Sequence, residues 1–122
     1  MARRLILDTN TLIAYERGSF DVIALDEDDL AIAAITVAEF RVGIELAGTA
    51  AQTTARARVL AAILDAITVL DYTERTAAEH ARLLAHVRRT GSPRGAHDLI
   101  IAAHAVADGR AIISLDAKAR FD

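Results

Sequence analysis

Near its start the chain has a short apolar run that ends in a carboxylate, at Arg4-Leu5-Ile6-Leu7-Asp8-Thr9-Asn10. Three consecutive aliphatic side chains are typical of a strand that is buried on both faces, as strands of parallel sheets are. A helix is expected to follow from about Thr11 to Tyr15, with Asn10 or Thr9 as its cap. This strand–helix unit favours an α/β fold, with Asp8 at the carboxyl end of the strand.

The same alternation continues along the rest of the sequence. Short apolar runs predict three further strands, at Leu30 to Ala34, Ile67 to Leu70 and Arg110 to Leu115. Alanine-rich stretches with helical spacing predict helices over about 36–46, 51–65, 73–89 and 96–108. Thr73 is expected to cap the third of these, and Gly109 to end the last in a left-handed conformation. Alternating strands and helices predict a short parallel sheet flanked by helices on both faces.

Length and composition limit the possible classes of protein. The 122 residues are 53% hydrophobic and 25% charged, which suits one folded domain over residues 1–122. Without cysteine there is no disulfide framework, thiolate zinc site or cysteine nucleophile. A net charge of −3 argues against nucleic-acid binding by bulk charge alone. The apolar runs are too short for a membrane span or a signal peptide, so the cytoplasm is the expected location.

Carboxylates follow three of the predicted strands: Asp8, Asp71 and Asp116. Two further acids, Glu39 and Asp98, fall in the first turns of predicted helices. In open parallel sheets, ligands bind outside the carboxyl ends of the strands, where such residues can gather. Crowded carboxylates repel one another unless a cation neutralises them, and Mg²⁺ prefers oxygen ligands of this kind. Carboxylates, a metal ion and water together suit phosphodiester hydrolysis.

Two of these acids also have a simpler structural interpretation. Thr36-Val37-Ala38-Glu39 has the form of a capping box, in which Glu39 would only close the helix start. Asp98 would favourably complement a helix dipole. Helical spacing, however, aligns Asp98 with Ala102 and Ala105, on a face that we expect to pack inward. A carboxylate on a packed face is costly unless it is paired or bound to metal.

Four stretches together resemble the PIN-domain ribonucleases and, within them, the VapC-type toxins of bacterial toxin–antitoxin pairs. The matching stretches are Leu7-Asp8-Thr9-Asn10, Ile35-Thr36-Val37-Ala38-Glu39-Phe40-Arg41-Val42-Gly43, His97-Asp98-Leu99-Ile100-Ile101-Ala102-Ala103-His104-Ala105 and Ile113-Ser114-Leu115-Asp116. Each motif alone is weak, but the ordered set in a short chain is specific. Ser114 departs mildly from the family pattern, which more often has threonine there.

This resemblance implies a single PIN-like nuclease domain with endoribonuclease activity that depends on Mg²⁺ or Mn²⁺. Asp8, Glu39, Asp98 and Asp116 would surround the metal as catalytic ligands, with Asn10 and Ser114 as supporting polar groups. The implied partners are an RNA substrate, a VapB-type antitoxin that blocks the site, and a second copy of the chain in a homodimer.

Other interpretations remain open at the level of sequence. A phosphoacceptor receiver domain has similar length and architecture, with Asp71 as acceptor and Asp8 holding Mg²⁺. A binding module that has the fold but no catalysis is a third possibility. The arginines around the only proline, Arg88, Arg89 and Arg94, are candidates to hold an RNA backbone. Equally, the first two would complement the dipole at the end of a helix.

Overall fold

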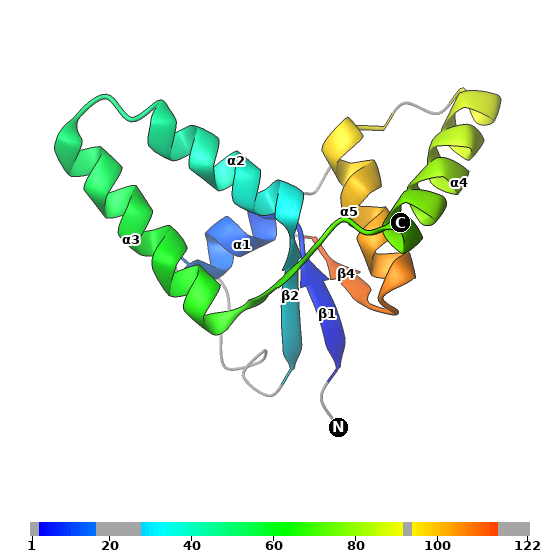
Figure 1. Cartoon of the computed structure of the whole chain (residues 1–122), viewed down its shortest axis with the longest axis horizontal. Coiled ribbons are helices and arrows are strands. Elements are labelled where there is room, and N and C mark those ends of the chain that lie inside the picture. Colours follow the sequence, from blue (N-terminus) through cyan, green and yellow to red (C-terminus); the bar gives the residue numbers. More distant parts are fainter. Residues whose placement is uncertain (1–2, 17–27, 92–93, 115–122) are drawn as a thin grey trace.

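A four-stranded parallel sheet forms the centre of the molecule (Figure 1). The computed structural model describes residues 3–16, 28–91 and 94–114. Within them the sheet has the order β3-β2-β1-β4, and every pair of neighbours is parallel. The strands are β1 (Arg4–Leu7), β2 (Asp29–Ala33), β3 (Thr68–Leu70) and β4 (Ala111–Ile113). The parallel α/β fold expected from the sequence is confirmed.

Five helices connect the strands, and four of them extend as two pairs from the sheet (Figure 1). They are α1 (Thr9–Glu16), α2 (Ala34–Glu45), α3 (Ala50–Ala66), α4 (Glu74–Thr90) and α5 (Ala96–Ala107). Helices α2 and α3 pack together on one side, and α4 and α5 on the other. In the described part of the chain, no helix has the length and apolar character that a membrane crossing requires.

The two faces of the sheet bury separate cores because successive side chains of a strand point to opposite faces. Leu7 and Ile32 face one core, which Leu12 and Ile63 complete from α1 and α3. The neighbouring residues Ile6 and Ala33 face the other core, with Ile101 and Ala105 from α5. Helices therefore cover both faces, as predicted, and the strands are apolar at consecutive positions for this reason.

The helix caps differ in part from those expected. The side chain of Thr73 caps α4, and Gly109 has a φ of +61°, so both of these predictions are confirmed. Helix α1 already begins at Thr9 and its cap is Asp8, whose Oδ1 accepts a hydrogen bond of 2.8 Å from the Thr11 N–H. The capping box at Thr36 was wrong, because α2 begins at Ala34 directly after its strand. Thr36 is fully buried, and its hydroxyl has no hydrogen-bond partner among the described residues.

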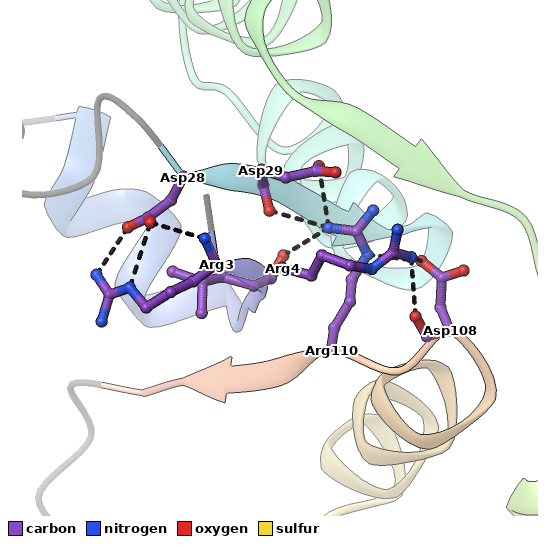
Figure 2. Close-up of polar contacts among 7 residues, drawn as sticks. Arg3, Arg4, Asp28, Asp29, Asp108 and Arg110 are labelled. Atoms are coloured by element: carbon purple, nitrogen blue, oxygen red, sulfur yellow. Dashed lines mark hydrogen bonds and ion pairs between the residues drawn. The ribbon is translucent and has the colours of Figure 1, made fainter. Parts of the chain in front are cut away.

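Arginines and aspartates form ion pairs where β1, β2 and β4 begin (Figure 2). The guanidinium of Arg110, 5% exposed, lies 2.6 Å from a carboxylate oxygen of Asp108 and 3.1 Å from one of Asp29. It also donates to the backbone carbonyls of Leu5 and Asp29. Arg3 pairs with Asp28 at 2.7 Å, and Arg4 pairs with Asp108 at 3.1 Å. This group of six side chains, the amino-edge network, ties together the starts of three strands.

The charges of this network shift the pKa values of its members. A hydrogen bond from Arg3 lowers the pKa of Asp28, and one from Arg110 lowers the pKa of Asp108. Burial works to lower the pKa of Arg110, but hydrogen bonds to Asp108 and Asp29 outweigh it and leave that pKa raised. Each of these shifts favours the charged form of the group concerned.

A buried histidine of α5 contacts the segment between β3 and α4. His104 is 2% exposed and makes an edge-to-face contact with Tyr72, with ring centroids 6.0 Å apart. Burial lowers the pKa of His104, although the nearby Asp108 and Asp71 act in the opposite direction. The ring is therefore neutral at neutral pH, and its contact with Tyr72 contributes to the packing of the helix whose first turn contains Asp98.

Candidate functional site

Three helices begin at the edge of the sheet where the strands end (Figure 1). Helix α1 follows β1, α2 follows β2, and the first turn of α5 extends past the strand ends. Asp8 caps α1, Asp98 lies in the first turn of α5, and Glu39 lies one turn into α2. The topology thus places three of the four predicted ligands at one edge, the carboxyl edge of the sheet. Asp116 lies outside the described residues.

Asp8 is held by the helix that it caps. Its backbone N–H donates to the carbonyl of Ile113 in β4 at 3.3 Å, and its Oδ1 accepts from the Thr11 N–H. The residue is half-buried. These contacts fix the carboxylate between the central strand and the last strand, with one oxygen committed to the cap.

Glu39 lies in the second turn of α2, because this helix starts earlier than the capping pattern suggested. Its Oε1 accepts a hydrogen bond of 2.9 Å from the hydroxyl of Thr9, and the Nδ1 of His97 lies 3.4 Å from the same oxygen. Thr9 directly follows Asp8, and His97 directly precedes Asp98. Glu39 therefore contacts the neighbours of both other acids and joins the starts of the three helices.

Asp98 is exposed, which corrects the expectation of a packed face. Ala102 is half-buried and Ala105 is buried, so burial along this face of α5 increases toward the end of the helix. The reason is that the first turn extends beyond the sheet and has no strand to pack against (Figure 1). The Oδ2 of Asp98 folds back over Gly95, where an added Cβ would lie only 3.0 Å away.

Two pockets open at the carboxyl edge. The first, of about 270 Å³, lies between α4, α5 and β4, and Asp8, Asp98 and Ser114 all contribute to its lining. The second, of about 330 Å³, lies between α1, α2 and α3 and is lined by Thr9, Glu39 and Arg56, among others. The predicted acids are thus divided: two share the first pocket, and Glu39 lines the second. Among residues 3–16, 28–91 and 94–114, no three His, Asp or Glu side chains gather closely enough to hold a metal ion.

The predicted supporting residues are also divided. Ser114 is half-buried and lines the first pocket beside Asp8 and Asp98. Asn10 is exposed in the first turn of α1 and lines neither of these two pockets. Of the supporting pair, only the serine lines the pocket that Asp8 and Asp98 share.

The three predicted RNA-binding arginines occupy different positions. Arg94 lines the first pocket together with Asp8 and Asp98. Arg88 and Arg89 lie in the last turn of α4, just before Gly91 ends that helix with a φ of +69°. Both line neither pocket, and their position suits the negative end of the helix dipole.

The strand order argues against a receiver domain. In the receiver order 2-1-3-4-5, the third strand pairs with the first. In this protein β3 is an edge strand that pairs with β2, and β1 lies between β2 and β4. Asp71, which follows β3, is therefore one strand further from Asp8 than a phosphoacceptor site requires.

Several residues of the site were not predicted as such. Leu83, His86 and Val87 of α4 line the first pocket, and Thr9 holds Glu39. The only sequence signal for Thr9 is its place directly after Asp8. The helical spacing of Leu83 and Val87 is present in the sequence, but it does not reveal which element this face of α4 meets.

Comparisons with known proteins identify the family and relatives that share the fold. The family model described as "PIN domain" matches residues 5–121. VapBC-5 from Mycobacterium tuberculosis, a member of the VapBC family of toxin–antitoxin systems, is 30% identical with a TM-score of 0.76, over 91% of this chain and 83% of that one. DNA-bound VapBC from Salmonella typhimurium is 28% identical with a TM-score of 0.79, over 92% and 85%.

A third structure extends the likeness of the fold. VapBC2 from Rickettsia felis, solved bound to a DNA fragment from its promoter, is 21% identical with a TM-score of 0.81, over 93% of this chain and 88% of that one. No curated protein matches the chain at a significant level. Because the PIN domain match spans residues 5–121 and the M. tuberculosis structure is 30% identical over most of both chains, this chain belongs to the PIN-domain family and, within it, to the VapC-type toxins, a class of nucleases.

Proposed function

We propose that this chain is a divalent-metal-dependent endoribonuclease and the toxin of a toxin–antitoxin pair, acting in the cytoplasm. Its catalytic and metal-binding residues in this proposal are Asp8, Glu39, Asp98 and Asp116. The observation that carries the proposal is the first pocket, where Asp8 and Asp98 share one lining with Ser114 although the two acids are far apart in the sequence. Two carboxylates brought together from distant parts of a chain suit a shared cation.

The described residues fit Mg²⁺ or Mn²⁺ as cofactor. Mg²⁺ is usually bound through one or two carboxylates, and water and substrate phosphates complete its shell. Asp8 and Asp98 would supply these carboxylates, Asp116 would add a third, and Glu39 would act from the adjoining pocket. When bound, the ion supplies an activated water and neutralises the charge that develops on the leaving oxygen.

The chain's own side chains position the reacting groups. The cap to α1 fixes the Asp8 carboxylate, and Thr9 and His97 fix the Glu39 carboxylate. In this proposal the Ser114 hydroxyl supports the acids beside it. Arg94, which lines the same pocket, would contact the RNA phosphates, with Arg88 and Arg89 as further candidates.

We further propose that a VapB-type antitoxin covers the second pocket. Glu39 and Val42 share one face of α2 by helical spacing, and Leu46 directly follows the helix as its C-cap; Val42 and Leu46 are 55% and 77% exposed. Exposed apolar side chains beside a carboxylate suit an amphipathic segment with a basic residue. An arginine or lysine from this segment would then silence the acids. A homodimer is part of the same proposal.

Cleavage of a total-RNA pool by the purified protein tests the nuclease proposal. We expect cleavage with Mg²⁺ or Mn²⁺, no cleavage in excess EDTA, and recovery when the ion is restored. Single-stranded DNA of matched length serves as the comparison substrate. Full activity in EDTA, or cleavage of DNA alone, would contradict the proposal.

Coexpression with the small protein encoded next to this gene tests the partner. We expect the two to copurify as an inactive complex, and Leu46→Glu to weaken that complex without reducing cleavage by the free toxin. Light scattering of the purified chain should give the mass of a dimer. A chain that neither arrests growth nor retains the adjacent protein is not a toxin of this kind.

A further inference from the structure

The first pocket is much more apolar than a site for metal and phosphate alone requires. Beside Asp8, Asp98 and Ser114, its lining comes from aliphatic side chains on three elements. These residues are Leu83 and Val87 of α4, Leu99, Ile101 and Ala102 of α5, and Ile112 of β4. Leu99 and Ile101 belong to the buried core, whereas Leu83, Val87, Ala102 and Ile112 are half-buried or exposed. These four side chains offer an apolar surface that a cation held by carboxylates does not need.

The dimensions of the pocket limit what it can hold. Its volume of about 270 Å³ lies just below the range of roughly 300–1,000 Å³ that is usual for drug-sized ligands. A single flat ring system fits a cavity of this size, whereas a dinucleotide or a helix does not. The ring systems that accompany a scissile phosphate in RNA are its bases. Proteins bind unpaired bases outside the base stack, against aromatic or apolar side chains.

The remaining lining residues suit the polar parts of a nucleotide. Arg94 and His86 are exposed residues of the same lining. Arginine presents a planar fork that matches phosphate oxygens, and a histidine ring donates to or accepts from a base edge. The pocket thus combines carboxylates for the cation, an apolar wall, and polar groups at the surface.

We propose that this pocket receives the unpaired base of a nucleotide next to the scissile phosphate, and that Ala102 and Ile112 help to set cleavage specificity. The proposal rests on the proposed ribonuclease function and deepens it. The base would lie against the aliphatic wall while its own phosphate lies beside Asp8 and Asp98. Cleavage is then confined to unpaired RNA, because a base inside a duplex cannot enter.

The test compares complete RNA oligonucleotides with oligonucleotides that lack one base. After the cleavage position is mapped in an unstructured RNA, two versions are synthesised with an abasic ribose on either side of the scissile bond. For the wild-type protein we expect one of these abasic versions to raise KM about tenfold, equivalent to about 1.4 kcal/mol, with little change in kcat.

Ala102→Phe fills the pocket from α5 and should raise KM for the complete RNA to the value of the abasic one. Val106→Phe is the matched control, since Val106 is 55% exposed one turn further along the same helix and outside the pocket lining. Val106→Phe should keep the wild-type difference in KM between the complete and the abasic RNA. Ile112→Ala, at a position 43% exposed, is a milder second variant that should raise KM about threefold for the complete RNA only.

Each outcome separates the pocket from the proposed function. Cleavage by the wild type with equal KM for all three oligonucleotides overturns the pocket and leaves the nuclease intact. The base-pocket proposal is also overturned if Ala102→Phe and Ile112→Ala both keep the full wild-type difference in KM between complete and abasic RNA. If Ala102→Phe instead weakens only the antitoxin complex, the pocket belongs to the partner and the proposal is wrong. Absence of cleavage by the wild type overturns the nuclease function, and the base pocket with it.

Discussion

The two edges of the sheet contain similar acids in opposite electrostatic settings. At the amino edge, Asp28, Asp29 and Asp108 are each paired with an arginine (Figure 2). At the carboxyl edge, Asp8, Glu39 and Asp98 form no ion pair with an arginine or lysine within the described residues. The partners of Asp8 and Glu39 at this edge are a backbone N–H, a threonine hydroxyl and a histidine.

The difference shows how one small domain separates stability from function. Arginine fixed against aspartate lowers the aspartate pKa, holds strands together and leaves little attraction for other ions. Acids left without a built-in cation attract one from solution or from a partner. The same residue type therefore serves as structural pairing at one edge and as a proposed ligand at the other.

The largest expected effect comes from removing a carboxylate at the carboxyl edge. Asp98→Asn should reduce RNA cleavage more than about 100-fold, because changes to residues merely supporting a metal ligand already cost 10–100-fold. Asp8→Asn should do the same. Asp71→Asn is the matched control, since Asp71 also follows a strand but lines neither pocket. Equal RNA cleavage by all three variants would show that the acids of the carboxyl edge have no special role in catalysis.

Removing ion pairs from the amino-edge network should lower the stability of the fold and leave RNA cleavage unchanged. Arg110→Met removes a 5% exposed guanidinium from two carboxylates and two carbonyls, and should cost about 2 kcal/mol of unfolding free energy. Urea titration measures this loss. Arg82→Met, which breaks the exposed pair with Glu79 on α4, should cost below about 0.5 kcal/mol. Equal losses in the two variants would refute a special role for the amino-edge network.

A third experiment separates the two roles of Asp8, as the cap of α1 and as a proposed metal ligand. Asparagine caps helices about as well as aspartate, so Asp8→Asn should keep the stability of the fold while it loses cleavage. Asp8→Ala loses the bond to the Thr11 N–H as well, and should cost about 1 kcal/mol of stability. Thermal melts of both variants give the comparison. If Asp8→Asn is as unstable as Asp8→Ala, the carboxylate charge rather than the cap supports the fold.

The smallest expected effect is a change in how the stability of the fold falls at acidic pH. The pKa of Asp108 lies below its ordinary value of 3.8 in the folded state, chiefly because of the hydrogen bond from Arg110. The unfolded chain therefore takes up this proton first, so the stabilisation is complete above about pH 5 and is lost as pH falls through the folded pKa. In Arg110→Met the fall in stability below about pH 4 should be shallower, by less than about 1 kcal/mol for such exposed carboxylates. A steeper fall in this variant would contradict the pairing.

Local sequence was sufficient to predict most of the fold. Consecutive aliphatic residues in β1 predict a strand buried on both faces, and both faces are covered. Thr73 and Gly109 mark helix ends through chemistry that acts over a few residues. The pattern at Thr36 failed because a buried strand continues straight into α2, and tertiary packing overrode the preference for a polar cap.

The site was less predictable because its geometry depends on distant contacts. The sequence predicted Asp8, Glu39 and Asp98 as ligands, but not that Glu39 would line a different pocket from the other two. Nor did it show that the first turn of α5 extends past the sheet and leaves Asp98 exposed. The bond from Arg110 to the Leu5 carbonyl spans 105 residues, and no local pattern marks such a pair.

The strand order has a consequence for the order of events during synthesis. Strand β1 pairs with β4, so Leu5 cannot pair with its neighbour in β4 until Ala111 has been synthesised. At translation rates of about 5–20 residues per second, this interval lasts about 5–20 seconds. Throughout it the first acid, Asp8, exists without the Ile113 carbonyl that holds its backbone, and for most of it without Asp98. The first pocket of a nascent chain is therefore incomplete until the last strand has been made.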